Sequence, residues 1–200
     1  MDKNLFSNEA IFQKCQSHIQ EELKRTKEEF ILEHYKKYSD PDMPPVWKTL
    51  EVITFGTLSK LYCNLKDNSI KKKIAKEFYL PQHIILENWI KCAVVLRNYL
   101  AHHARLWNRN FPIIPQTSKP FRKKWLNHQI PVTNKLYPHL CSLQYFLNSI
   151  KEDNFFKERL KVLIANHPNV DIAAMGFPAD WEKEPLWEGR ANGLVLLSPL

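Results

Sequence analysis

Glycine is scarce in this chain, and that scarcity narrows the folds open to it. Only four of the 200 residues are glycine, whereas thirteen are proline. Hairpin-rich β proteins need glycine at tight turns, but helices joined by proline-containing loops do not. The composition therefore favours an all-α fold. No glycine-rich phosphate-binding motif of the Rossmann or P-loop type is present in the sequence, so those two protein classes are excluded at the level of motifs.

The spacing of apolar residues supports this fold class. Apolar side chains recur at intervals of three and four residues, the pattern of a helix with one buried face. We expect helices over residues 8–37, 46–65, 69–78, 82–109, 133–150 and 154–167. These helices predict a bundle.

The bundle is interrupted by a long loop and followed by a short cap. Residues 110–131 contain four prolines and carry a basic cluster of Lys119, Arg122, Lys123 and Lys124 beside Trp125. A loop of this length in a compact domain is often functional. Residues 170–188 are rich in Trp and Phe and are expected to dock on the bundle. We predict one domain over residues 1–188, with its core at about 44–167, and a loose tail over 189–200.

The positive charge is concentrated in the middle of the sequence. The formal net charge is +8, and residues 88–151 contain ten Lys or Arg and neither Asp nor Glu. Basic residues displace the counterions of a polyanion, whereas carboxylates repel it. This distribution favours a nucleic-acid or other polyanion partner, and the alternative is a solvated basic surface without a ligand.

The spacing of the cysteines and the N-terminal sequence predict an intracellular protein that binds no structural metal and does not span a membrane. The four cysteines are far apart and form no C-x-x-C pair, so no structural zinc site is expected. The sequence shows no secretory signal and no apolar run of ~18 residues. We expect a cytoplasmic protein with reduced thiols, no cofactor, no bound metal and no membrane partner.

The predicted helix over residues 82–109 carries the candidate chemistry. With 100° per residue, one polar face collects Lys91, Asn98, His102, Arg105 and Arg109. Arg97 falls instead within the apolar stripe, where an unpaired guanidinium is costly. We therefore expect Arg97 to pair with a carboxylate, for which Glu51 is a candidate, or to lie where the stripe meets another chain.

These residue types suit the cleavage of a phosphodiester. A histidine takes or gives a proton near neutral pH, and an arginine holds a phosphate and stabilises developing charge. RNA supplies its own nucleophile, the 2′-hydroxyl. Metal-dependent phosphodiesterases use carboxylate ligands, which this third of the chain lacks. The pattern is therefore compatible with cleavage of RNA without a metal.

The segment 96–109, LRNYLAHHARLWNR, resembles the signature of the Abi-like abortive-infection family, part of the HEPN superfamily of helical ribonucleases. The superfamily motif is Arg, often followed by a polar residue, and then His after a short spacer. Here four residues separate Arg97 from His102. The flanking text also resembles the family, over residues 47–65, 72–81 and 175–187. The resemblance spans roughly residues 20–188 and corresponds to the C-terminal part of the family pattern.

This resemblance implies a HEPN-like bundle that dimerises, so that two Arg/His motifs share one site. It implies a metal-independent endoribonuclease that acts as an abortive-infection toxin in phage defence. Whether an antitoxin or a regulatory RNA or protein is a further partner stays open at this point. Arg97 and His102 would be catalytic, with Asn98 in support. His103, Arg105 and Arg109 would hold RNA. Arg97 and His102 lie about 140° apart on a straight helix, so a bend, the long Arg side chain or the partner chain must bring them together.

Two other functions stay open at this point. The first is a catalytically silent RNA-binding module that keeps the basic face. In either RNA-binding function, Lys91, Arg122, Lys123 and Lys124 are expected as further contacts to RNA. The second is a structural dimer, in which Arg97 and His102 are buried and paired.

Ordinary structural roles are expected for several other residues. We read the run from Lys71 to Lys73 as a solvated helix face, Trp107 and Trp125 as packing residues, and His139 as a core residue.

Overall fold

The computed structural model describes residues 1–41, 43–118, 120–127 and 133–188, and within these residues it contains helices and no strand. The predicted all-α class is therefore confirmed. The α-helices are α1 (Glu9–Arg25), α2 (Glu29–Lys37), α3 (Val46–Val52), α4 (Phe55–Asn64), α5 (Asn68–Glu77), α6 (His83–Ala101), α7 (Leu136–Ile150) and α8 (Phe156–Ala165). Three short 3-10 helices are η1 (Lys3–Leu5), η2 (Ala173–Met175) and η3 (Trp181–Lys183).

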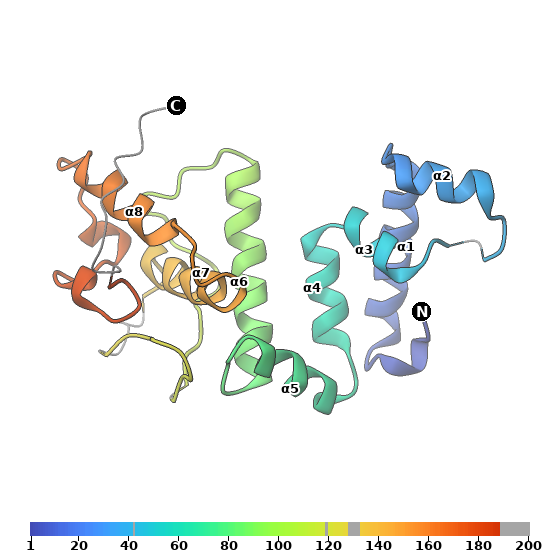
Figure 1. Cartoon of the computed structure of the whole chain (residues 1–200), viewed down its shortest axis with the longest axis horizontal. Coiled ribbons are helices and arrows are strands. Elements are labelled where there is room, and N and C mark those ends of the chain that lie inside the picture. The colour runs from blue at the N-terminus through green and yellow to red at the C-terminus, as the bar shows by residue number, and fades with distance from the viewer. Residues whose placement is uncertain (42, 119, 128–132, 189–200) are drawn as a thin grey trace.

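Helix α6 stands in the middle of the molecule (Figure 1). Helix α4 packs on one side of it and α7 on the other, while α5 lies across the end at which α6 begins. Helix α1 packs against the outer side of α4, and α8 packs against α7. Helix α6 therefore contacts both the N-terminal and the C-terminal helices, and the end of α5 adds a direct contact with α7 through Phe78 and Phe146, whose ring centroids lie 5.5 Å apart.

Two predicted long helices are each broken in two. The helix predicted over residues 8–37 ends at Arg25, because Thr26 adopts an extended backbone and its Oγ1 accepts the Glu28 N–H at 3.3 Å. The helix predicted over 46–65 breaks at Thr54, whose Oγ1 accepts the Thr57 N–H at 3.1 Å and begins α4. A threonine hydroxyl competes for the backbone in this way and favours caps over helix interiors.

A small apolar cluster holds the N-terminal helices together. Both halves of the first broken helix contribute to it, α1 through Leu23 and α2 through Ile31, and α4 adds Leu61. The bend at Thr26 is what allows α1 and α2 to reach the same cluster.

The larger core is aromatic and fixes the proline-rich loop and the cap. Trp89 of α6 packs against Phe121 and Trp125 of the loop, with ring centroids 5.8 and 5.3 Å away. Its indole N–H donates to Gln116 O at 2.7 Å. Trp187 of the cap is buried and donates to the Tyr137 hydroxyl at 3.1 Å. The predicted docking of the cap is thus confirmed, whereas the predicted tail 189–200 lies outside the described residues.

Candidate functional site

The buried stripe of α6 differs from the predicted one. The buried side chains are Ile85, Leu86, Trp89, Cys92 and Leu96. This stripe is rotated by about 60° from the predicted stripe, at 100° per residue. Arg97 and Leu100, which were expected on the buried face, are exposed. In the last turn the core contact is made by Tyr99, whose ring lies 5.6 Å from that of Phe111, and Arg97 and Leu100 point away from that contact to the surface.

Helix α6 ends at Ala101, eight residues before the predicted end at 109. His102 is the C-cap, and His103 takes a left-handed conformation with φ 50°. The His103 N–H donates to Leu100 O at 3.0 Å, and the Ala104 N–H donates to Tyr99 O at 2.8 Å. These two bonds form a Schellman motif, which normally places glycine at the left-handed position. The sequence has a histidine there, so the usual signal for a helix end is missing.

This helix end carries Arg97, Asn98 and His102; a side-chain bond joins the first two, and an ordinary helical backbone bond joins His102 to Asn98. The Arg97 guanidinium donates from Nη1 to Asn98 Oδ1 at 3.3 Å, and the His102 N–H donates to Asn98 O at 3.1 Å. All three residues are exposed. The long side chain of Arg97 therefore reaches toward the side of the helix that carries Asn98. The structural-dimer hypothesis expected Arg97 and His102 to be buried and paired, and in the single chain both are exposed.

The prediction that Glu51 pairs with Arg97 is wrong. Glu51 is exposed on α3, and no ion pair joins it to Arg97 among the described residues. Because Arg97 lies on the surface, it needs no buried carboxylate to offset desolvation.

The residues that follow the helix end form a compact basic turn rather than a helix face. Arg109 donates from Nε to Arg105 O at 2.6 Å, and its guanidinium lies 4.3 Å from the centre of the Tyr99 ring. The predicted helical stacking of Arg105 and Arg109 over His102 is therefore wrong. Lys135, which sequence reasoning missed, donates to Asn108 Oδ1 at 2.6 Å and adds a cation to this turn. Lys135 follows the loop and is far from Asn108 in the sequence, so no local pattern could have predicted this contact.

The basic loop residues Arg122, Lys123 and Lys124 lie elsewhere. Lys123 donates to Asn148 O at 3.0 Å and lies 4.5 Å from the centre of the Tyr79 ring. Tyr79 precedes the start of α6, whereas His102 caps its end, about 27 Å away along the helix axis. Lys124 pairs with Glu188 at 3.4 Å. The structure does not bring these loop residues to Arg97 and His102.

Lys91 is exposed on α6, two turns before Asn98 and on the same side.

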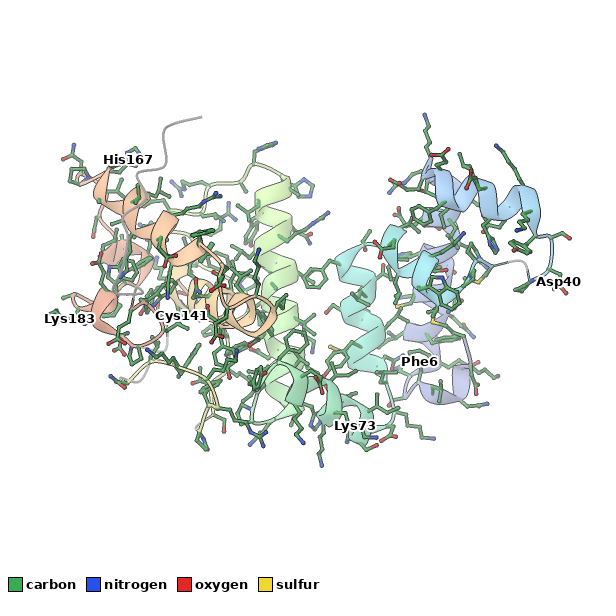
Figure 2. All side chains as sticks on the ribbon, viewed as in Figure 1. Phe6, Asp40, Lys73, Cys141, His167 and Lys183 are labelled. Carbon is green, nitrogen blue, oxygen red and sulfur yellow. The ribbon has the colours of Figure 1, made fainter. Side chains whose placement is uncertain are left out.

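Among the lysines of α5, Lys73 projects from the surface (Figure 2), but Lys71 is buried and pairs with Glu87 at 3.0 Å. The expectation that the whole run is solvated is therefore wrong for Lys71, because the ion pair and a bond to Cys63 O satisfy its ammonium group.

The expected core role of His139 is confirmed. His139 is 1% exposed, its ring lies 4.1 Å from that of Phe111, and burial lowers its pKa to about 4. Trp125 is also buried, as expected, but Trp107 is 41% exposed and only its indole N–H is bonded, to Asp171 O at 3.3 Å.

The described residues contain no group of three or more His, Cys, Asp or Glu side chains placed to bind a metal. Within the same part of the chain, no helix combines the length and the apolar composition needed to cross a bilayer.

Comparison with known proteins gives one match. The model of the Abi-like protein family matches residues 1–108. The match begins before the resemblance noted in the sequence, at about residue 20, and it includes Arg97, Asn98 and His102. No curated protein and no solved structure matches the chain. Because the family model covers more than half of the chain and includes the exposed end of α6, this protein belongs to the Abi-like protein family.

Proposed function

We propose that this protein is a metal-independent endoribonuclease of the abortive-infection type. The family suggests an abortive-infection function. The observation that carries the ribonuclease proposal is the exposed group of Arg97, Asn98 and His102 at the end of α6, in which the side chains of Arg97 and Asn98 are bonded and His102 follows Asn98 one turn later on the same side.

The proposed reaction is an attack by the RNA on itself. The 2′-hydroxyl oxygen bonds to the adjacent phosphorus, and its proton passes to the His102 imidazole. The bond from phosphorus to the 5′-oxygen breaks, that oxygen takes a proton from a water molecule, and the proton held by His102 returns to the resulting hydroxide. The products are a 2′,3′-cyclic phosphate and a 5′-hydroxyl. Arg97 binds the phosphate and stabilises its developing charge, and Asn98 orients the Arg97 guanidinium.

The charge distribution supports RNA as the partner. Arg97, His103, Arg105 and Arg109 belong to the helix end and the turn after it, Lys135 bonds to that turn at Asn108, and residues 88–151 contain no carboxylate. We expect RNA affinity to fall steeply with salt, because it rests on phosphate contacts. Equal affinity at low and physiological ionic strength would contradict this.

A homodimer is part of the proposal. Leu100, beside Arg97, is 55% exposed and offers an apolar surface for a second copy. The sharing of one site between two Arg/His motifs rests on the resemblance alone.

The proposal is tested by incubating the protein with mixed labelled RNAs in EDTA. We expect the wild type to cleave and to leave cyclic-phosphate ends, and His102→Ala to be inactive. The matched control is His167→Ala, because His167 is also exposed but lies beyond α8 (Figure 2). This control should cleave like the wild type. Salt-sensitive binding without cleavage by any of the three proteins would favour the RNA-binding module instead.

A further inference from the structure

A groove of about 400 Å³ lies between α4 and α6. The size is within the ~300–1,000 Å³ range of small-ligand sites. Val94 and Val95 of α6 line it, and Gly56 of α4 lines it without a side chain. A Cβ at Gly56 would lie 3.9 Å from Val94 Cγ1, so a small side chain fits there and a large one would fill the groove.

The groove has an unbalanced positive charge. Lys60 of α4 and Lys91 of α6 both line it and are exposed. Helix α4 contains no Asp or Glu, and the one carboxylate of α6, Glu87, is paired with Lys71 at 3.0 Å. An apolar floor with a cationic rim fits a ligand that has a flat apolar part and anionic groups.

The groove leads to the exposed end of α6. Lys91 and Asn98 are seven residues apart on the same side of the helix, and His102 follows four residues later. At 1.5 Å per residue, Asn98 lies about 10.5 Å and His102 about 16.5 Å beyond Lys91. Helix α4 lies beside α6 in the opposite direction (Figure 1), so Gly56 lies toward this end. A bound strand would reach from Lys91 to His102 in a few nucleotides.

We propose that the groove between α4 and α6 binds single-stranded RNA a few nucleotides from the cleaved phosphate. Lys60 and Lys91 contact its phosphates, and one unstacked base lies against Val94 and Val95. This inference rests on the proposed function. A duplex does not suit the groove, because paired RNA hides its base faces and offers mainly phosphates and 2′-hydroxyls.

A native cysteine reports on occupancy of the groove. Cys63 lines it and is partly exposed, whereas Cys15, Cys92 and Cys141 are buried. Burial raises the pKa of the Cys63 thiol, so alkylation by iodoacetamide is best followed at about pH 8.5. The probe is a short single-stranded RNA with 2′-O-methyl groups, which the proposed reaction does not cleave. At ten times its Kd, it should slow the modification of Cys63 roughly tenfold, because only the free fraction reacts. Cys63→Ser identifies the modified thiol.

Charge substitution supplies the second readout. The double variant Lys60→Gln/Lys91→Gln should lower the slope of log affinity against log salt by about 1.4, or ~0.7 for each lost phosphate contact. The matched control is Lys24→Gln/Lys36→Gln, which removes two exposed lysines from α1 and α2. The control should keep the slope of the wild type.

The outcomes separate this inference from the proposed function. Protection of Cys63 together with the lowered slope supports the groove. RNA that binds with unprotected Cys63 and an unchanged slope overturns the groove and leaves the ribonuclease proposal standing. If neither this RNA nor the uncleaved mixed RNAs bind at low salt, both proposals are wrong.

Discussion

The first half of α6 and its last turn are stabilised by different interactions. The first half is fixed by packing, since Trp89 is fully buried among the rings of Phe121, Trp125 and Tyr145. The last turn is closed by backbone bonds at His103 and Ala104 and packs only through Tyr99, on the ring of Phe111 at 5.6 Å, while its polar side chains are exposed. The comparison indicates that most of the packing of α6 comes from its buried face up to Leu96, which leaves the polar side chains of the last turn available for chemistry.

The largest effect on stability is expected at the packed half. Trp89→Ala should lower the free energy of unfolding by about 3–5 kcal/mol, because it leaves a cavity inside the aromatic cluster. Trp107→Ala is the matched control beyond the helix end, where the exposed ring makes one hydrogen bond, and it should cost less than about 1 kcal/mol. Urea unfolding measures both values, and equal losses would contradict the comparison.

The next effect concerns pH. Burial lowers the pKa of His139 from 6.5 to about 4. Between these values the unfolded chain binds a proton that the folded chain does not. The stability is therefore complete above about pH 6.5, and about 3 kcal/mol is lost as the pH falls to 4. Urea unfolding at pH 7 and about pH 4.5 should show a smaller loss for His139→Leu than for the wild type. Parallel losses would exclude His139 as the cause.

A smaller effect separates the buried lysine from its exposed neighbour. Glu87→Gln leaves the ammonium group of Lys71 without its counter-ion and should cost about 2 kcal/mol. This is less than the ~3–5 kcal/mol of a fully buried pair, because the Glu87 side chain is 19% exposed. Lys72→Gln should stay within about 0.5 kcal/mol of the wild type. Equal free energies of unfolding for the two variants would refute the distinction between Lys71 as a buried, paired lysine and Lys72 as an exposed one.

The smallest effect on stability is expected at the C-terminal end of α6, where His103 takes a left-handed conformation. His103→Gly should raise the free energy of unfolding by about 0.5–1 kcal/mol, because glycine adopts a φ of 50° without strain. His102→Gly should give no gain, because His102 has a φ of −96°. Thermal unfolding of the two variants provides the test, and a gain at position 102 alone would mean that the cap is assigned to the wrong residue.

The sequence predicted the parts of the fold that depend on apolar spacing. The positions of α5, α7 and α8 were predicted to within about three residues, because their periodicity is bounded by clear loop signals. The helix breaks at Thr26 and Thr54 were not predicted. A threonine can lie inside a helix or cap the start of a new one, and the sequence alone does not show which of the two occurs.

The candidate site was predicted in its residues but not in its geometry. Charge and spacing singled out Arg97, Asn98 and His102. The end of α6 could not be placed, because a histidine occupies the position where glycine normally marks a helix end. Lys135 was missed for a different reason: its contact with Asn108 depends on how the loop folds back, which no local pattern records.

The most direct test of the central claim measures activity and stability on the same preparations. Wild type, Arg97→Ala and His102→Ala should be compared for RNA cleavage in EDTA and for the free energy of unfolding. We predict that both variants cleave at least about 100-fold more slowly. Their unfolding free energies should remain within about 0.5 kcal/mol of the wild type, because both side chains are exposed. Full cleavage by either variant, or a loss of activity matched by a loss of stability, would contradict the account.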